Sequence, residues 1–465
     1  MDFSLPEHLP GLLAEMDAFI EAEIKPLERE HIQYFDHRRE YARTDWDNGG
    51  VPRRDWEDLL TEMRRRADAA GWLRYGLPSR FGGRDGSNID MAVIREHLAH
   101  KGLGLHNDLQ DESSIVGNFP QVIMMDRFGT DEQKAAWTEA LITGERSMAF
   151  GLTEPNHGSD ATWLETTAVR DGDDWVINGA KRWNTGVHRA THDLIFARTS
   201  GEPGQARGIT AFLVPTDSPG FTVPYYWWTF NMPTDHGEVV LDNVRVPAEA
   251  VLGEVGRGLD VGQTFLHENR IRQAASSLGA GQYCIDRAVG YANERSVFGK
   301  PLAVNQAVQW PLVELQTEAQ MVRLLVYYAA SQLDANHHME VSDKVSMANY
   351  RANRLVCEAA DRAMQVHGGV GYSRHEPFEH IYRHHRRYRI TEGAEEIRSV
   401  VSPSACSGSV ADEPARPAAG GADPAARRRR DRQSDAAHRG RQPHDVGVRR
   451  GERYPSGSDP AYRPS

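Results

Sequence analysis

The chain has 465 residues, of which 39% are hydrophobic and 26% are charged, the balance of a soluble globular protein with about three domains. Its net charge is −12, and residues 402–465 contain 12 Arg but only 8 acidic residues, so residues 1–401 carry a net charge of −16. Because this body is so acidic, we expect no nucleic acid as a partner.

Cysteine usage and apolar runs indicate the cellular compartment. The three cysteines, at positions 284, 357 and 406, form no C-x-x-C pair, so neither a disulfide framework nor a zinc site is expected. The N-terminal stretch M-D-F-S-L-P-E lacks the basic and apolar segments of a signal peptide, and no apolar run approaches the ~18 residues of a membrane span. We therefore expect a cytoplasmic protein without a membrane span or a bound metal.

Residues 1–147 show the three- and four-residue spacing of apolar side chains that is typical of amphipathic helices. The clearest examples are Leu12, Leu13, Met16, Phe19 and Ile20, and then Trp56, Leu59, Leu60 and Met63. We expect an all-helical N-terminal domain over this range.

Between about Phe150 and Pro247 the pattern changes to short strands. The segments T-T-A-V-R and W-V-I-N-G flank an Asp171-Gly172 turn, which predicts a β-hairpin. Further apolar runs follow, separated by Gly, Pro and Asp. We expect a central β-barrel or β-sandwich domain over residues 148–256.

From about Gly258 the helical spacing returns. Apolar residues alternate steps of four and three over residues 308–333 and 345–366, which is typical of long helices packed in a bundle. We expect a C-terminal four-helix bundle over residues 257–401. The predicted fold class is therefore α+β, with an all-α domain, a β domain and a helical bundle in that order.

Residues 402–465 have no apolar periodicity and consist largely of Ala, Gly, Pro and Arg. Such a segment cannot bury enough surface to offset its ordering entropy, so we expect a disordered tail. Because the composition changes abruptly, we also hypothesise that this tail is an out-of-frame translation of GC-rich coding sequence.

Two segments of the β region carry groups suited to binding. The loop F-G-L-T-E-P-N-H-G-S-D, at residues 150–160, offers hydroxyls and backbone N–H groups of the kind that hold a phosphate or a flavin, although an ordinary polar turn has the same composition. In K-R-W-N-T-G, Trp183 and Thr185 share one face of a strand. A flat cofactor could stack on the indole and hydrogen-bond the hydroxyl; core packing of the tryptophan is the alternative.

A third segment, Y-R-I-T-E-G-A-E-E-I-R, places Glu392 directly before Gly393. A glycine there allows a tight turn, and the glutamate could then project into a cavity as a general base. The alternative is an ordinary glutamate at a helix start, stabilised by the helix dipole.

The order of five motifs resembles the acyl-CoA dehydrogenase family. In chain order they are T-E-P-x-x-G-S-D, K-x-W-x-T-G, E-R-x-x-F-G-K-P-L, Q-x-x-G-G-x-G-Y and I-x-E-G-x-x-E-I, and the resemblance runs from about residue 10 to residue 400. The family's layout is also helical, then β, then helical.

The resemblance implies that FAD is the cofactor. The implied cofactor-binding residues are Phe150, Leu152, Thr153, Ser159, Trp183, Thr185, Arg295, Phe298, Asn305, Gln306, Gln365, Gly368, Gly369, Ala394 and Glu396. Within this set, the group from Arg295 to Gln306 matches residues that reach the FAD of a neighbouring subunit. The group from Gln365 to Gly369 matches the site for the adenosine-diphosphate part.

The resemblance also implies an acyl-CoA substrate site. Glu392 matches the catalytic base; some family members place their base on an earlier helix, at the position of Asn269 here, where the adjacent Glu268 is a rival. The implied substrate-binding residues are Ser159, Arg270 and Gly393 and, near the acyl pocket, Glu112 with Leu109 and Ile115.

The expected activity is α,β-dehydrogenation of an acyl-CoA thioester in fatty acid metabolism, with the α-proton taken by Glu392 and the β-hydride transferred to FAD. The resemblance further implies a homo-oligomer (a dimer, or a homotetramer built as a dimer of dimers) and an electron-transferring flavoprotein as the electron acceptor. A flavin oxidase or monooxygenase on the same fold stays open, as does a non-catalytic binding protein if the altered C-terminus abolishes FAD binding.

Overall fold

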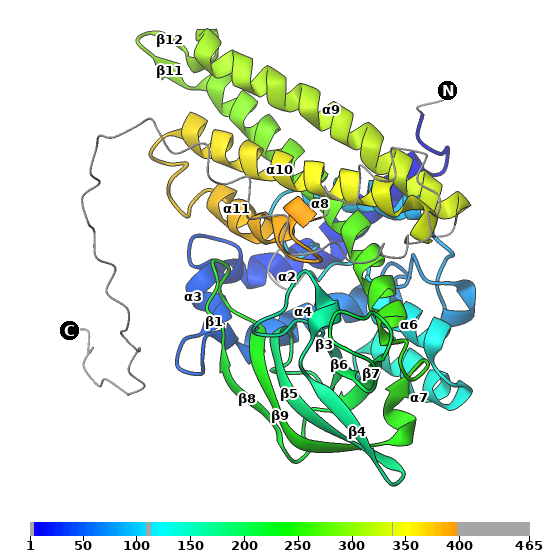
Figure 1. The fold of residues 1–465 in the computed structure, drawn as a ribbon. Coiled ribbons are helices and arrows are strands. Elements are labelled where there is room, and N and C mark those ends of the chain that lie inside the picture. Colours follow the sequence, from blue (N-terminus) through cyan, green and yellow to red (C-terminus); the bar gives the residue numbers. More distant parts are fainter. Residues whose placement is uncertain (1–3, 108–112, 337, 398–465) are drawn as a thin grey trace, which may run out of the picture. The chain divides into compact units, whose positions relative to one another are not determined.

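The N-terminal part of the chain is helical, as the spacing of its apolar residues predicts (Figure 1). Its helices are α1 (Leu9–Phe19), α2 (Lys25–Glu30), α3 (Arg39–Arg43), α4 (Arg54–Ala69), α5 (Asn88–His100), α6 (Pro120–Phe128) and α7 (Asp131–Thr143). A short hairpin of β1 (Thr44–Asp45) and β2 (Val51–Pro52) follows α3. Capping boxes start α5 at Ser87 and α7 at Thr130, which satisfies backbone donors of the first helical turn.

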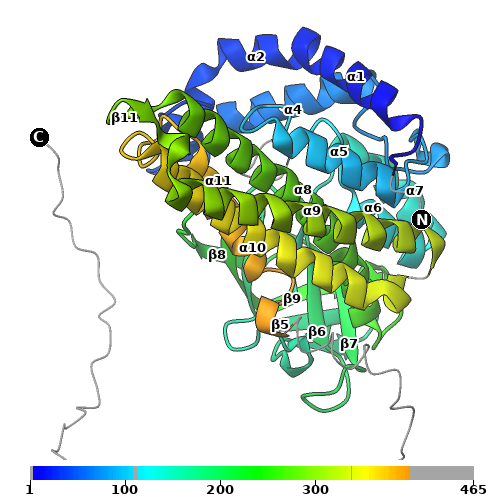
Figure 2. The same cartoon turned by 90° about the horizontal axis from the view of Figure 1, so that it is seen from above.

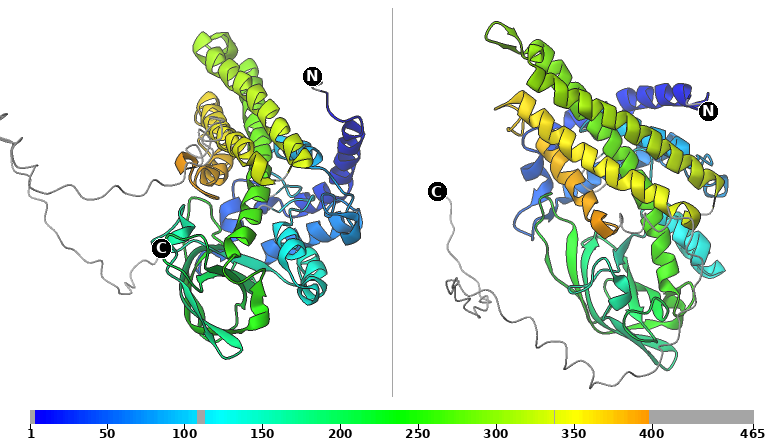
Figure 3. Two further views of the ribbon diagram at one scale, coloured as in Figure 1. Left: turned by 45° about the vertical axis from the view of Figure 1, so that its right-hand side comes forward. Right: turned by 45° about the horizontal axis from the view of Figure 1, so that its top comes forward.

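A central β-sheet follows, which confirms the prediction of a β region between two helical ones. Its strands are β3 (Met148–Gly151), β4 (Thr167–Asp171), β5 (Asp174–Thr185), β6 (His192–Arg198), β7 (Ile209–Pro215), β8 (Phe221–Tyr226), β9 (His236–Pro247) and β10 (Val251–Leu252). The strand order is β10-β7-β6-β4-β5-β9-β8, and β3 pairs in parallel with β6. Figure 3 shows the strands curving around one core, to which Ile177, Phe212 and Val239 contribute fully buried side chains.

The predicted hairpin is the pair β4–β5, and Gly172 in its turn has a left-handed φ of 64°. A second irregularity lies in β5, where the register against β9 shifts between Arg182 and Asn184. Trp183 occupies this bulge with a φ of 66°. Because of the bulge, Trp183 and Thr185 are exposed while Asn184 between them points into the core.

The C-terminal part is a bundle of four helices, as expected (Figure 2), and the two apolar stripes predict two of them. They are α8 (Gly258–Glu294), α9 (Gln306–Ala335), α10 (Ser342–His367) and α11 (Phe378–Arg386), with a hairpin of β11 (Ser296–Val297) and β12 (Lys300–Pro301) between the first two. The facing positions of α8 and α10 are rich in buried alanine, which lets the helix axes approach closely. Helix α5 of the N-terminal part also packs on α8.

The computed structural model describes residues 4–107, 113–336 and 338–397, and these belong to one compact unit, Met1–Gly408. The predicted tail at 402–465 lies outside the described residues, and the domain limits 1–147, 148–256 and 257–401 remain a proposal. In the part of the chain that is described, no helix has the length and apolar character of a membrane span.

Arg39 links the N-terminal helices to α11. Its guanidinium is 2% exposed and donates at 2.7 Å both to Glu379 Oε1 of α11 and to the carbonyl oxygen of Arg374. Because α11 leads directly to the turn that contains Glu392, this contact fixes the approach of the chain to its candidate base.

Replacement of Arg39 by Met should lower the free energy of unfolding by about 3 kcal/mol, because it leaves a carboxylate and a buried carbonyl without this donor. Urea denaturation at a fixed protein concentration measures the change. The matched control is Arg38→Met, because Arg38 pairs with Asp36 at the surface and should change stability far less. Equal effects of the two substitutions would contradict the structural role of Arg39.

Candidate active site

Glu392 and Gly393 form a turn after α11. Both have left-handed backbone conformations, with φ of 52° at Glu392 and 92° at Gly393. A non-glycine residue in this region is uncommon, and such strain persists where the surroundings hold it in place. Gly393 therefore has the conformational role that its position in E-G suggests, and the turn directs Glu392 toward α8.

Two residues of α8 hold Glu392. Gln273 Nε2 donates to Glu392 Oε2 at 2.8 Å, and Arg270 Nη2 and Nε donate to the Glu392 carbonyl oxygen at 2.6 and 3.2 Å. Burial lowers the pKa of the Arg270 guanidinium, although the Glu392 carboxylate opposes this shift. No residue of the described chain bonds Glu392 Oε1, so this oxygen is available to a ligand.

A chain of buried polar side chains supports Gln273. Asn349 Nδ2 donates to Gln273 Oε1 at 3.3 Å, and Asn353 Nδ2 donates to Asn349 Oδ1 at 3.0 Å. Ser277 Oγ in turn contacts Asn353 Oδ1 at 2.7 Å and His385 Nδ1 at 3.0 Å. All five side chains are buried between α8, α10 and α11, and the hydrogen bonds among them hold the Gln273 amide in place.

Glu395 anchors the segment after the turn. It is buried, and its carboxylate accepts hydrogen bonds from Arg389 Nη2 at 2.6 Å and from Arg354 Nη2 at 3.1 Å. Burial alone would raise the pKa of Glu395, but the hydrogen bonds from Arg389 and Arg354 outweigh it and lower this pKa to about 2. Its neighbour Glu396, a predicted cofactor residue, is exposed, and Ala394 is partly buried.

The residues predicted at the flavin ring lie on β3, β5 and the loop after β3. Phe150 stacks on Phe265 of α8, with ring centroids 4.2 Å apart. Leu152 and Thr153 are partly exposed, and the Thr153 carbonyl accepts from the Arg182 N–H at 2.9 Å.

Trp183 and Thr185 lie on the exposed face of β5. The Trp183 side chain is 43% exposed and lies 5.1 Å from the Trp227 ring, and the Thr185 hydroxyl contacts His236 Nδ1 at 3.0 Å. An aromatic ring and a hydroxyl are therefore both exposed on this face of β5, and an accessible aromatic face is what stacking of a flat ring requires.

A buried ion pair anchors the loop between β3 and β4. Lys181 Nζ donates to Glu154 Oε1 at 2.7 Å, and Glu154 also accepts from the backbone N–H of Thr166 at 2.9 Å. Both charged side chains are buried, and Glu154 joins the start of the loop from Gly151 to Thr166 to its end and to β5. Ser159, in the same loop, is exposed.

Two groups of predicted residues lie away from Glu392 in the fold. Arg295, Phe298, Asn305 and Gln306 lie in and beside the β11–β12 hairpin, where the Phe298 ring is fully exposed. Gln365, Gly368 and Gly369 are exposed at the C-terminal end of α10.

Several residues predicted near the substrate lie outside the described part of the chain or have a packing role. Glu112 and Leu109 lie outside the described residues, as does the side chain of Glu268. Ile115 is fully buried in the core of the N-terminal helices. Asn269 accepts at Oδ1 from Asn118 Nδ2 at 3.2 Å and from Arg272 Nη2 at 3.1 Å, so its amide has a packing role.

The sequence predictions missed Gln273, Lys181, Glu154 and Glu395. A signal existed for Gln273, because it follows Arg270 by three residues and so shares its helix face. The partners of the others are set by contacts between distant segments.

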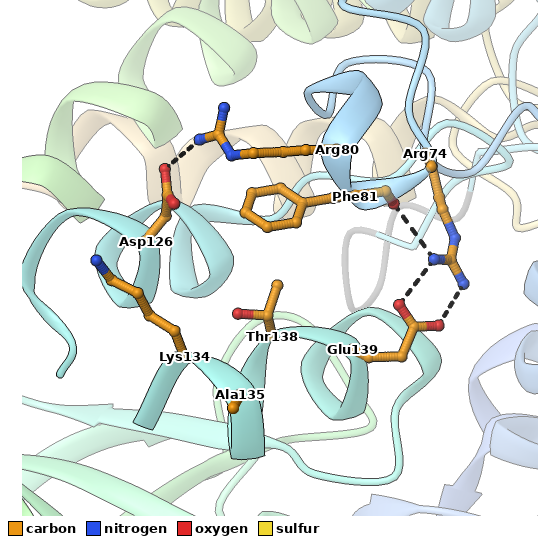
Figure 4. A pocket seen from close by; sticks show the side chains of 9 residues that line it. Arg74, Arg80, Phe81, Asp126, Lys134, Ala135, Thr138 and Glu139 are labelled. Atoms are coloured by element: carbon orange, nitrogen blue, oxygen red, sulfur yellow. Dashed lines mark hydrogen bonds and ion pairs between the residues drawn. The ribbon is translucent and has the colours of Figure 1, made fainter. Parts of the chain in front are cut away.

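A surface pocket of about 550 Å³ that does not include Glu392 lies beside α6 and α7 (Figure 4). Its lining residues are Arg74, Arg80, Phe81, Gly82, Asp126, Lys134, Ala135, Thr138 and Glu139. Arg74 pairs with Glu139 at 2.9 Å and Arg80 with Asp126 at 2.6 Å, so its guanidinium groups are already neutralised. None of the predicted site residues that the structure describes lines this pocket. Over the described ranges, no three His, Cys, Asp or Glu side chains are grouped to hold a metal ion.

The fold and motifs agree with the comparisons with known proteins. The sequence matches the family descriptions "Acyl-CoA dehydrogenase, N-terminal domain" at residues 11–145, "middle domain" at 149–244 and "C-terminal domain" at 256–401. The chain belongs to the acyl-CoA dehydrogenase family and is an oxidoreductase that acts on an acyl-CoA.

The similar proteins include enzymes named as reductases and enzymes named as dehydrogenases. The chain is 33% identical over 352 residues to a 3-(aryl)acrylate reductase of Clostridium sporogenes, covering 74% of this chain and 89% of that protein. It is 32% identical over 317 residues to an acyl-CoA dehydrogenase of Mycobacterium tuberculosis, covering 68% and 79%. A glutaryl-CoA dehydrogenase of Mycobacterium smegmatis, solved in complex with FADH2, has a TM-score of 0.70 at 26% identity, covering 88% of this chain and 97% of that one.

Replacement of Glu395 by Gln should destabilise the protein by about 2 kcal/mol near neutral pH, because two charge-assisted hydrogen bonds weaken. The folded-state pKa is depressed, so this contribution is present above pH 4.5 and is lost as the pH falls toward about 2. Urea unfolding of both proteins from about pH 7 down to about pH 3 measures the difference. A difference that stays constant over this range, or an equal effect of Glu396→Gln, would contradict the anchoring role.

Proposed function

We propose that this protein catalyses the FAD-dependent α,β-dehydrogenation of an acyl-CoA thioester, with Glu392 as the base that removes the α-proton. The observation that carries the proposal is the strained Glu392–Gly393 turn, held against α8 by Arg270 and Gln273. A base must be fixed within hydrogen-bond reach of the proton that it removes, and this turn fixes one carboxylate.

The two oxygens of Glu392 have different tasks in this mechanism. Oε2 is held by Gln273, so Oε1 takes the proton from the carbon next to the thioester carbonyl. The backbone N–H of Glu392, which donates to no described residue, can donate to that carbonyl and stabilise the charge that develops there. One turn thus provides both the base and an oxyanion donor.

The residues on β3 and β5 fit a flavin. Trp183 offers an exposed ring plane, Thr185 an adjacent hydroxyl, and the loop from Gly151 to Thr166 is anchored by the buried Glu154–Lys181 pair. When bound there, FAD supplies the acceptor for the hydride that leaves the β-carbon. Phe150, Leu152 and Thr153 would orient it.

A second candidate is the reverse reaction, reduction of a 2-enoyl-CoA, which the 33% identity to a 3-(aryl)acrylate reductase favours. In that direction protonated Glu392 returns its proton to the α-carbon. The same side chains serve both directions, so the substrate pair and the electron partner decide between them.

We also propose a homo-oligomer. One face of α9 exposes an apolar stripe at helical spacing, formed by Trp310, Val313, Met321, Leu324 and Tyr328. Such a stripe on a soluble protein marks an interaction surface. A second subunit against it would agree with the implied role of Arg295 to Gln306 at a neighbour's FAD. An electron-transferring flavoprotein as acceptor, a cytoplasmic location and a role in fatty acid metabolism belong to the same proposal.

The test of the function is an anaerobic titration of the purified protein with acyl-CoAs of different length and polarity, followed by flavin absorbance. Dehydrogenation predicts bleaching by at least one saturated acyl-CoA. Bleaching by none, together with reoxidation of the reduced flavin by a 2-enoyl-CoA, would favour the reductase. A protein without flavin would contradict both, and rapid reoxidation by oxygen would favour an oxidase.

Replacement of Glu392 by Gln should leave FAD and acyl-CoA binding intact, because the amide keeps the size of the side chain. Flavin reduction by acyl-CoA should fall by about 10²–10⁴-fold, the loss expected for a positioned general base. Stopped-flow absorbance measures the rate, with Glu268→Gln as the comparison. A near-normal rate in the first variant and a large loss in the second would move the base to α8.

Replacement of Gln273 by Leu should slow flavin reduction by about 10- to 100-fold, because Glu392 Oε2 loses the only donor that it has among the described residues and the carboxylate can turn away. The matched control is Gln282→Leu, which removes another buried amide of α8, bonded to Asp286 and Gln316. Both variants should lose stability, but only Gln273→Leu should lose rate at saturating substrate. Equal rates in the two variants would show that Gln273 does not position the base.

A further inference from the structure

Asn184 and Asp193 form a fully buried polar pair behind the predicted flavin surface. Asn184 lies on β5 and Asp193 on the nearby β6, and the Asn184 Nδ2 group contacts Asp193 Oδ2. Neither side chain has any exposed surface. No step of the proposed mechanism uses them.

The pair has too few hydrogen-bond donors if Asp193 is ionised. Asn184 Oδ1 and Asp193 Oδ1 are both buried and have no hydrogen-bond partner among the residues that the structure describes. A carboxylate and an amide together present three acceptor oxygens but only one donor group. A proton on Asp193 would supply the missing donor, and buried polar atoms without partners are costly enough to favour it.

The surrounding charges also favour a neutral Asp193. The charged groups that face it from β5 and the adjoining loop are Lys181 and, through Lys181, Glu154. Glu154 already pairs with Lys181, so an ionised Asp193 would leave one net negative charge buried. The cross-strand neighbours of Asp193 on β3 and β7 are Ala149 and Val214, which cannot compensate it.

Burial raises the pKa of Asp193 to about 7, although the Asn184 hydrogen bond and the Lys181 charge lower it in part. The raised pKa agrees with the shortage of hydrogen-bond donors around Asp193 and with the net negative charge that its ionisation would bury.

The pair touches both strands that carry the predicted flavin residues. Asn184 stands between Trp183 and Thr185 in β5. A Cβ added to Gly151, next to Phe150 in β3, would lie 2.9 Å from Asn184 Nδ2 and 3.1 Å from Asp193 Oδ1. The pair therefore packs directly beneath the backbone of β3 and inside the bulge of β5.

We infer that Asp193 is a protonated, neutral carboxyl group, and that its pair with Asn184 positions β3 and the β5 bulge for the flavin. The positioning role rests on the proposed function, whereas the protonation does not. Ionisation of Asp193 would place a negative charge behind the flavin surface and separate the two strands, so flavin retention becomes sensitive to pH.

The first test compares the unfolding of wild type with that of Asp193→Asn, without FAD, from about pH 5 to about pH 8. The folded-state pKa lies above the unfolded value of 3.8, so the stability that the proton gives is lost as the pH rises toward about 7. The unfolding constant of wild type relative to the variant should rise by about 10-fold per pH unit over this window and level off above it.

Asp173→Asn is the matched control, because Asp173 lies in the exposed β4–β5 turn. The ratio of the wild-type unfolding constant to that of Asp173→Asn should not vary with pH over this window. If the ratio of the wild-type unfolding constant to that of Asp193→Asn did not change with pH, Asp193 would be ionised in the folded protein and the inference would be overturned. Failure of this variant to fold would overturn it as well, because an amide reproduces the size and the donor and acceptor of a protonated carboxyl group.

The second test measures the release of FAD from loaded protein by the fluorescence of free flavin. Wild type should release FAD several-fold faster at about pH 8 than at about pH 6, and Asp193→Asn should lose this dependence. An equal pH dependence in both proteins would overturn the positioning role. A protein that holds no FAD would contradict the proposed function, and the unfolding comparison would still decide the protonation of Asp193.

Discussion

The turn at Glu392 and Gly393 is the constraint on which the proposed chemistry depends. Two successive left-handed residues reverse the chain after α11, and this conformation is unfavourable at Glu392, which has a Cβ, unless the surroundings hold it. The carbonyl of the first is held by Arg270 and its carboxylate by Gln273, so the strain and the contacts with α8 support each other. Arg39 extends this support to the N-terminal helices through α11.

Buried polar groups recur wherever the fold positions a functional segment. The Gln273–Asn349–Asn353 chain lies beneath the candidate base, the Glu154–Lys181 pair beneath the predicted flavin loop, and the Asn184–Asp193 pair between β3 and β5. Each such group costs desolvation energy and gains stability only when its partners are in place.

The sequence predicts the fold class well because the period of its apolar residues changes at the right places. The stripes over residues 308–333 and 345–366 correspond to α9 and α10, and the Asp171-Gly172 turn joins β4 to β5. Strand β9 is longer than an apolar run, because its outer face carries polar residues such as Asp242 and Arg245, which the apolar pattern does not register.

The site is predicted less completely, for a physical reason. The sequence motifs identify Glu392, Trp183 and Thr185 as candidate site residues. The residues that hold them in place are brought together only by tertiary contacts. Gln273 lies 119 positions from Glu392, and Lys181 lies 27 from Glu154. The bulge that turns Trp183 outward depends on pairing with β9, which no local pattern specifies. Roles of side chains in a site follow from such long-range contacts.

The most direct measurement of the central claim is exchange of the α-hydrogen of an acyl-CoA in D2O under anaerobic conditions, followed by NMR. Removal of the α-proton by Glu392 predicts that the wild-type protein introduces deuterium at the α-carbon and that Glu392→Gln, still loaded with FAD, does not. Equal exchange by both proteins would contradict the assignment of Glu392 as the base.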